Sequence, residues 1–344
     1  MTTNKARHVP VLLEETMDFL AVRAGGTYVD CTVGLAGHAS AILRRLGPTG
    51  HLIGFDRDPE ALTLATATLE QVRAELQSES GAEAPRVTLI GEAFSRIEEH
   101  LGPASVDGIL ADFGVSSMQL DEAYRGFSFQ ADGPLDMRMD TRQGSTAAQV
   151  VNEMDERELA NLIYEYGDER RSRRFARAIV RARPITTTGQ LSRIVAGCAP
   201  PIHSLPIHPA TRTFQALRIY VNRELGEIRD LMEAAPRVLK PSGRLAVISF
   251  HSLEDRIVKD SLRDGAKQGI WELLTKKPAT ASEDEKNRNP RARSAKLRAA
   301  VRVSPSDKLG TAGTYGKGRR NMRDGSKKHA RQAKENSDTI TETS

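Results

Sequence analysis

The residues that decide the fold run from Tyr28 to Asp58 and read YVDCTVGLAGHASAILRRLGPTGHLIGFDRD. An apolar run ending in Asp30 leads into a turn that carries Gly34 and Gly37, and an amphipathic helix and a second apolar run ending in Asp56 follow. This order is typical of a βαβ unit that holds an adenosine group. Small residues let the backbone approach the ligand, and the final carboxylate accepts hydrogen bonds from ribose hydroxyls. The stretch therefore predicts a nucleoside-binding site.

The turn excludes two other phosphate-binding patterns. No GKS or GKT follows the glycines, so the turn is not a P-loop, and GLAGHA lacks the third glycine of the G-x-G-x-x-G dinucleotide fingerprint. The missing third glycine disfavours an NAD-type oxidoreductase. Plain packing of helix against strand is the structural alternative for these glycines, and the acid at Asp56 favours the nucleoside site over it.

A second segment, residues 106–120, reads VDGILADFGVSSMQL and places Asp112 between an apolar strand and a Gly/Ser-rich loop. In a doubly wound sheet the strand across the switch point delivers its last residues into the ligand crevice. An exocyclic amine attacks a sulfonium methyl only when hydrogen-bond acceptors orient the NH2 group and take up the developing charge. Asp112 can do this, and a simple cap on the following segment is the alternative.

Apolar runs alternate with helical stretches along the chain, which indicates an α/β fold. The expected strands are Tyr28–Val33, His51–Asp56, Arg86–Gly91, Asp107–Asp112, Arg244–Phe250 and Leu297–Val303. Residues 113–243 are far more than one crossover needs, so they contain an inserted domain. Its helices are expected at Glu156–Tyr166, Glu169–Arg183 and Thr188–Ala196, and one long helix at Arg212–Leu239 returns to the sheet and ends at the turn Pro241–Gly243. We divide the chain into a sheet domain of residues 1–118 and 211–304, an insertion of residues 119–210 and a tail of residues 305–344.

Six blocks of the chain resemble one known family. They are DFGVSSMQLD (Asp112–Asp121), RGFSF (Arg125–Phe129), DGPLDMRMD (Asp132–Asp140), HPATRTFQALRIYVNREL (His208–Leu225), SFHSLEDRIVK (Ser249–Lys259) and NPRARSAKLR (Asn289–Arg298). These blocks resemble the RsmH (MraW) family from about His8 to Val303. The resemblance implies a Rossmann-like, S-adenosylmethionine-dependent methyltransferase sheet with an inserted, mostly helical second domain. It also implies methylation of N4 of a cytidine in the decoding region of 16S rRNA, in the small ribosomal subunit.

The resemblance also implies the residues that bind S-adenosylmethionine: Ala36, Gly37, His38, Asp56, Phe94, Asp112 and Gln119. Ala36 stands where the family usually has glycine, which is harmless if its φ is negative and crowds the methionine moiety otherwise. Met118 replaces a family proline in the loop that presents Gln119. For His38, packing at the start of a helix is the structural alternative.

The loop Arg125–Asp140 is expected to roof the active site. Phe127 and Phe129 could stack on a base, and Asp136 (a second candidate catalytic residue) and Arg138 could read the cytosine edge. The alternative is that the phenylalanines are core and that Asp136 and Arg138 form an internal ion pair. His251 and Glu254 follow the fifth strand and should face the crevice, unless Glu254 only stabilises a helix start capped by Ser252. No metal site is predicted, because His203, His208 and His251 match no ligand spacing.

Basic residues suggest how RNA is held. The net charge is +5, and arginines at helical spacing include Arg173 and Arg177, which we expect to bind RNA. Residues 305–344 are rich in Lys, Arg, Gly and Ser, which predicts a disordered tail with non-specific phosphate affinity. No apolar run could span a bilayer and no signal peptide is recognisable, so a cytoplasmic protein is expected. DNA is not an expected substrate, because the D/N-P-P-Y/F loop of DNA amino-methyltransferases is absent. A non-catalytic RNA-binding ribosome assembly factor stays as the alternative function.

Overall fold

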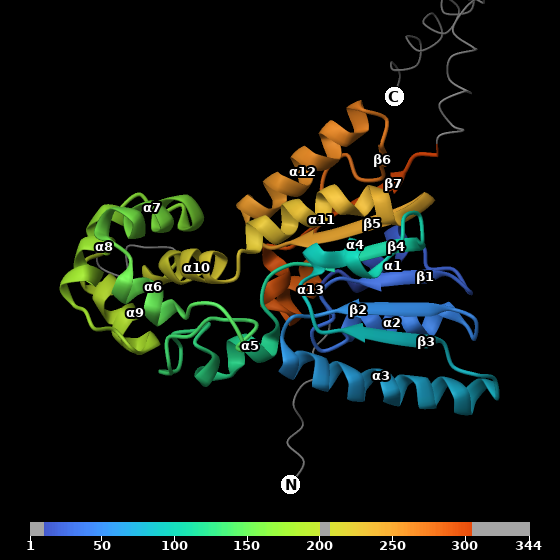
Figure 1. The fold of residues 1–344 in the computed structure, drawn as a ribbon, viewed down its shortest axis with the longest axis horizontal. Coiled ribbons are helices and arrows are strands. Elements are labelled where there is room, and N and C mark those ends of the chain that lie inside the picture. Colours follow the sequence, from blue (N-terminus) through green and yellow to red (C-terminus); the bar gives the residue numbers. More distant parts are fainter. Residues whose placement is uncertain (1–9, 200–206, 305–344) are drawn as a thin grey trace, which may run out of the picture. The chain divides into compact units, whose positions relative to one another are not determined.

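The computed structural model describes residues 10–199 and 207–304, and all of them belong to one compact unit (Figure 1). The predicted basic tail, residues 305–344, lies outside the described residues. The unit consists of a twisted sheet with helices on both faces and a cluster of helices inserted between the fourth and fifth strands of that sheet.

The described strands form one sheet of order β3-β2-β1-β4-β5-β7-β6. The strands are β1 (Thr27–Asp30), β2 (His51–Phe55), β3 (Arg86–Ile90), β4 (Val106–Asp112), β5 (Leu239–Ser249), β6 (Trp271–Leu273) and β7 (Lys296–Arg302). β1 to β5 pair in parallel, and β7 runs antiparallel to both of its neighbours. The strand order reverses between β1 and β4, so the ligand crevice of such a sheet should lie at the carboxyl ends of these two strands. The predicted Rossmann-like α/β class is confirmed.

Each face of the sheet carries its own hydrophobic core because neighbouring strand residues point to opposite sides. Tyr28 and Leu110 pack on one face, and Val29 and Ile109 pack on the other. The helices around the sheet are α1 (Leu13–Leu20), α2 (Gly37–Leu46), α3 (Pro59–Ser80), α4 (Ile97–His100), α11 (Glu224–Val238), α12 (Ser252–Lys267) and α13 (Glu283–Arg288). Burial on both faces explains the continuous apolar runs of the central strands.

The insertion is mostly helical, as predicted, and has a third hydrophobic core that runs from Phe127 to Leu217. Its helices are α5 (Ser117–Asp121), α6 (Ala147–Glu153), α7 (Glu156–Gly167), α8 (Ser172–Arg181), α9 (Thr188–Gly197) and α10 (Ala210–Val221). Phe214 and Leu217 of α10 pack in this core, so the helical layer continues past the boundary that we placed at residue 210. No helix among the described residues is long and apolar enough to cross a membrane.

One expectation for the return to the sheet is wrong. The single helix predicted over Arg212–Leu239 is two helices, α10 and α11, because Arg223 adopts a left-handed conformation with φ 50°. The turn predicted at Pro241–Gly243 is present as a bulge within β5: Leu239 pairs with Val106 and Arg244 with Gly108, and Ser242 between them has φ 63°. The short strand β6 was not predicted.

Candidate active site

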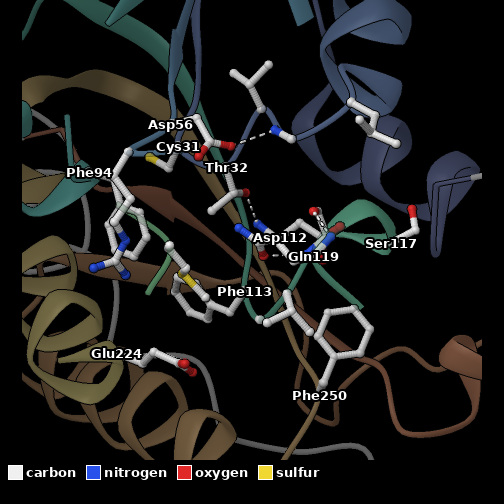
Figure 2. Close-up of a pocket in the computed structure, with 18 of the residues that line it drawn as sticks. Cys31, Thr32, Asp56, Phe94, Asp112, Phe113, Ser117, Gln119, Glu224 and Phe250 are labelled. Carbon is white, nitrogen blue, oxygen red and sulfur yellow. Dashed lines mark hydrogen bonds between the residues drawn. The ribbon is translucent and has the colours of Figure 1, made fainter. Parts of the chain in front are cut away.

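A cavity of about 300 Å³ opens at the carboxyl ends of β1, β2 and β4 (Figure 2). Cys31, Asp56 and Asp112, which end these strands or directly follow them, all line it. Further walls come from the insertion through Met139 and from the α10–α11 junction through Glu224. The sheet therefore brings together the two acids that the sequence pattern indicated, at the predicted switch point.

The turn after β1 forms one wall of the cavity with its backbone. Gly34 has φ 50°, a conformation that glycine adopts without steric cost, and its N–H donates to Asp56 Oδ2 at 2.9 Å. We expected Ala36 to leave the methionine moiety uncrowded only if its φ were negative. Its φ is 65°. Its methyl group is nevertheless buried in the core beside α2 and does not line the cavity. Ala36 therefore leaves the methionine side uncrowded, and the neighbouring Gly37 lines the cavity as predicted.

Asp56 is oriented by two backbone hydrogen bonds. Its Oδ2 accepts from Gly34 and its Oδ1 accepts from the N–H of Asp58 at 2.9 Å. Burial raises the pKa of Asp56 to about 6, against these hydrogen bonds, which lower it. Each carboxylate oxygen has a second lone pair, so the group can still accept from ribose hydroxyls.

Two rings form an apolar wall of the same cavity. Phe94 begins a short 3₁₀ turn after β3, and its ring centroid lies 5.7 Å from that of Phe113, which follows β4. Both rings line the cavity. An offset pair of this kind suits a flat purine, as expected for Phe94.

Asp112 is the acid at the end of β4. Its N–H donates to Thr32 Oγ1 at 2.7 Å, and its Oδ1 is buried with no hydrogen-bond partner among the described residues. Burial, then the charges of Asp30 and Glu254, raise the pKa of Asp112 well above its ordinary value. His38 lies on the other side: its Nδ1 is 3.6 Å from Asp112 Oδ2 and its Nε2 is 3.1 Å from the carbonyl oxygen of Val11. Within the described part of the chain, the buried Oδ1 of Asp112 is therefore an acceptor that is open to a ligand's donor.

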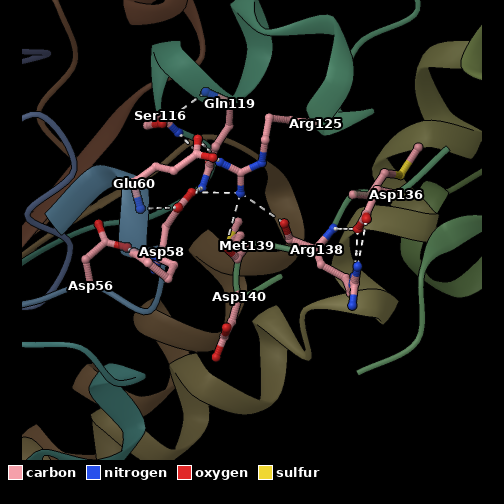
Figure 3. A network of polar contacts seen from close by, with 12 residues as sticks. Asp56, Asp58, Glu60, Ser116, Gln119, Arg125, Asp136, Arg138, Met139 and Asp140 are labelled. Carbon is pink, nitrogen blue, oxygen red and sulfur yellow. Dashed lines mark hydrogen bonds and ion pairs between the residues drawn. The ribbon is translucent and has the colours of Figure 1, made fainter. Parts of the chain in front are cut away.

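Gln119 lines the cavity but is committed to a buried network (Figure 3). Its Nε2 donates to Asp58 Oδ2 at 2.8 Å, and its Oε1 accepts from the N–H of Ser116 at 3.0 Å. Arg125 Nη2 lies 2.8 Å from the same Asp58 oxygen and also donates to the carbonyl oxygens of Arg138 and Met139, both at 3.1 Å. The network thus ties the turn after β2 to the loop over the active site.

The remaining loop residues match the structural alternatives rather than direct contact with a base. Phe127 is buried in the core of the insertion, and the ring of Phe129 packs against those of His208 and Phe214. Asp136 and Arg138 form an ion pair with an Oδ1–Nε distance of 2.8 Å.

None of the four residues is among the described residues that line the cavity, so this geometry does not put Asp136 beside the reacting atoms. Burial opposes the ionisation of Asp136, but its hydrogen bonds with Arg138 hold the pKa below the ordinary value.

A buried charge cluster at the edge of the cavity was not predicted. Arg218 donates from Nε and Nη2 to the two carboxylate oxygens of Glu224, at 2.8 and 2.9 Å. Glu254 accepts from the N–H of Phe250 at 2.7 Å, and its Oε1 is 3.1 Å from Nε2 of His251.

The two alternatives for Glu254 are both present: it lines the cavity and it supports the start of α12, where the cap is His251 and not Ser252. Glu224, His251 and Glu254 lie close enough to hold a cation, although Arg218 already neutralises Glu224. Nothing in the sequence pattern marked Arg218, whose position follows from the break between α10 and α11.

The predicted RNA-binding arginines lie on α8. Its apolar residues Phe175 and Ile179 are buried in the insertion, which leaves Arg173 and Arg177 exposed on the opposite face. Arg177 Nε is 3.3 Å from Glu156 Oε1, an exposed pair.

The cavity fits the methyl donor that the family resemblance implies. A backbone turn with a positive-φ glycine, an oriented carboxylate at the end of β2 and a two-ring wall are what an adenosine group requires. Asp112, whose buried Oδ1 has no hydrogen-bond partner among the described residues, lies between Thr32 and Phe113 in the same cavity (Figure 2). Asp56 would hold the ribose, Phe94 and Phe113 would form one apolar wall beside the adenine, and the turn after β1 would enclose the methionine end.

Comparisons with known proteins identify the family of the chain. The model of the MraW methylase family matches residues 5–303. Over 296 residues the chain is 66% identical to the ribosomal RNA small subunit methyltransferase H of Acidobacterium capsulatum, an alignment that covers 86% of this chain and 98% of that protein. The protein of the same name from Koribacter versatilis is 58% identical over 297 residues, which cover 86% of this chain and 94% of that protein. The predicted resemblance is confirmed: the chain belongs to the MraW methylase family, whose methyl donor is S-adenosylmethionine.

Proposed function

We propose that this chain transfers a methyl group from S-adenosylmethionine to N4 of a cytidine in the decoding region of 16S rRNA, within the small ribosomal subunit. The relatives named ribosomal RNA small subunit methyltransferase H support the substrate class. The observation that carries the choice of an amine is Asp112, whose buried oxygen lacks a partner among the described residues beside the cofactor cavity.

An amine target needs what Asp112 offers. The bound sulfonium supplies an electrophilic methyl group. The nitrogen lone pair of a cytosine amine is delocalised into the ring, so an acceptor must hold the NH2 group with its lone pair directed at that methyl. Asp112 accepts one N–H and stabilises the positive charge that develops on nitrogen as the bond forms. The raised pKa of Asp112 also suits a group that takes the proton released from the methylated amine.

The test is the modification state of 16S rRNA. Small subunits are isolated from a strain that lacks this protein, incubated with the purified chain and S-adenosylmethionine, and their rRNA is digested to nucleosides for mass spectrometry. N4-methylated cytidine should appear only with active enzyme. A non-catalytic assembly factor would leave the nucleosides unchanged, and a methyl group on carbon or oxygen would contradict the proposed chemistry.

Asp112→Asn tests the residue that carries the proposal. The variant keeps the shape of the side chain but removes its charge, so turnover should fall by about a hundredfold or more. The affinity for S-adenosylmethionine should change by much less, and it must be measured beside the rate because Asp112 also borders the cofactor. Asp264→Asn, an exposed carboxylate on α12, is the matched control and should behave as the wild type. A near-normal rate for Asp112→Asn would reduce Asp112 to a structural cap.

A further inference from the structure

A second cavity, of about 420 Å³, is lined by residues at the junction of α10 and α11. Figure 1 shows this junction, where the chain leaves the insertion and returns to the sheet. Its walls contain Ser145, Val150, Tyr166, Ile219, Tyr220, Val221, Arg223, Leu225, Gly226 and Arg229. The methyl-transfer chemistry proposed above uses none of these residues. The cavity nevertheless adjoins the active site, because Glu224, which lines the cofactor cavity, lies between Arg223 and Leu225 in sequence.

The α10–α11 cavity is positively charged, unlike the α3 groove described below. Arg223 and Arg229 are its charged residues, and no carboxylate is among the described residues that line it. Both arginines are exposed, and within the described part of the chain neither forms an ion pair. A third cavity, the α3 groove, has more acids than bases in its lining: Glu14, Glu15, Glu60, Asp121, Glu122 and Glu285 against Arg288 and Arg291. A polyanion that reaches the active site is therefore attracted by the α10–α11 cavity and repelled by the α3 groove.

The backbone holds Arg223 at a conformation that costs an L-residue free energy. Its φ is 50° and its ψ is 28°, in the left-handed region where glycine has no steric penalty. The two sequence neighbours of Arg223 are both held by hydrogen bonds, which fixes this backbone conformation. The side chain of Asn222 donates to the carbonyl oxygen of Met137 and accepts from the N–H of Met139, while Glu224 is held by Arg218. The chain therefore presents a guanidinium at a rigid position that glycine would occupy at lower cost.

Two aromatic rings complete the cavity. Tyr220 is 43% exposed, which is high for a large hydrophobic residue, and Tyr166 is half-buried in the same wall. Exposed aromatic rings next to exposed arginines form the usual platform for an unstacked base and its phosphate.

We infer that the α10–α11 cavity binds a nucleotide that flanks the methylated residue in single-stranded RNA. Arg223 and Arg229 contact the phosphate, and Tyr220 stacks on the base. The inference rests on the proposed function in one respect, which is that the substrate is RNA. It assigns to the junction of the two helices the task of holding the strand while its neighbouring nucleotide enters the active site.

Arg223→Gly separates binding from folding. The substitution removes the guanidinium and at the same time relieves the left-handed backbone, so the melting temperature should equal or exceed that of the wild type. Asp168→Gly, at φ 49° at the end of α7, controls for the effect of glycine itself. Arg256→Gln on α12 controls for the loss of one exposed positive charge. Tyr220→Ala tests the ring.

Two measurements use the full chain. The first is the affinity for a fluorescent single-stranded RNA oligonucleotide across a salt series. The second is kcat and KM with small subunits from a strain that lacks the protein. Arg223→Gly should weaken RNA affinity about tenfold and make the slope of log affinity against log salt shallower by about 0.7 for each phosphate that the variant no longer neutralises. KM should rise while kcat and S-adenosylmethionine affinity stay within about twofold. Tyr220→Ala should weaken affinity and leave the slope unchanged, because stacking carries no charge.

The outcomes are distinct. If Arg223→Gly folds and changes neither RNA affinity nor KM by more than about twofold, the inference is overturned. A rise in KM with unchanged oligonucleotide affinity also overturns it, because the cavity would then contact a protein of the subunit. If the wild type binds RNA through Arg223 but leaves the subunits unmethylated, the proposed function fails and the nucleotide site stands.

Discussion

Replacing Arg125 by Met should cost more stability than any exposed charge on the same loop. The guanidinium is 2% exposed and lies 2.8 Å from Asp58, which is 1% exposed. It also donates to Glu60 and to the carbonyl oxygens of Arg138 and Met139. Methionine fills much of the same volume, so the loss is mainly electrostatic.

The magnitude follows from what the substitution leaves behind. Asp58 would remain buried with Gln119 as its side-chain donor, and two buried carbonyl oxygens would lose a hydrogen bond. Removing one partner of a buried ion pair typically costs about 3–5 kcal/mol. For a protein of this size that corresponds to a fall in melting temperature of about 4–8 °C. The adjacent pair of Arg142 and Asp140 has similar geometry, but Arg142 is 57% exposed, so Arg142→Met should cost less than about 1 kcal/mol.

Thermal unfolding and urea titration of the wild type, Arg125→Met and Arg142→Met measure both effects. The double variant Asp58→Asn/Arg125→Met removes the stranded charge, so it should be less destabilised than the sum of its single variants by about 1–3 kcal/mol. Equal losses for Arg125→Met and Arg142→Met, or strict additivity in the double variant, would refute the reasoning that the buried network holds the loop.

Three further predictions concern single groups. Asp56→Ala should weaken S-adenosylmethionine binding about tenfold or more by calorimetry without unfolding the protein, because ribose hydroxyls lose a buried acceptor; unchanged affinity would place the ribose elsewhere. Burial raises the pKa of Asp30 to about 7 from 3.8, so the folded state holds more protons than the unfolded state between these values, and stability should fall as pH rises from about 4 to 7. The difference between the two pKa values corresponds to up to about 4 kcal/mol of folding free energy. In Asp30→Asn the urea midpoint should therefore depend less on pH between about 4 and 7. A pH dependence equal to that of the wild type would contradict a raised pKa at Asp30. Charge reversal at Arg173 and Arg177 should abolish methylation of small subunits even at low salt if α8 docks on the subunit; recovery of activity at low salt would instead indicate general attraction.

The sheet was predictable because its strands are buried on both faces. A buried parallel strand appears in sequence as an unbroken apolar run, and the predicted run His51–Asp56 differs from β2 by one residue. The acids that end these runs, Asp56 and Asp112, reach the cavity because parallel strands end at the same edge. The apolar runs and the rules of parallel-sheet topology were therefore sufficient to predict that Asp56 and Asp112 lie together at the cavity.

The other half depends on tertiary contacts that no periodic pattern records. The stretch Arg212–Leu239 has helical composition throughout, yet Asn222 hydrogen-bonds to the loop at Met137 and Met139 and the next residue turns left-handed. That break directs α11 along the sheet and places Arg218 and Glu224 at the cavity. Sequence propensity is a weak guide when a distant loop supplies the hydrogen bonds that end a helix.

The loop Arg125–Asp140 shows why motif residues near an active site need not touch the substrate. Phe127 and Arg125 are buried, and Asp136 is paired with Arg138, so these side chains hold the loop against the sheet and the insertion. These residues stand in blocks that resemble the family as closely as the block of Asp112 does, yet they support the loop and do not line the cavity. The distinction comes from the cavity walls. Arg218 and Glu254 line the cavity together with Asp112, whereas Asp136 and Arg138, expected to read the cytosine edge, and the two phenylalanines, expected to stack on the base, do not.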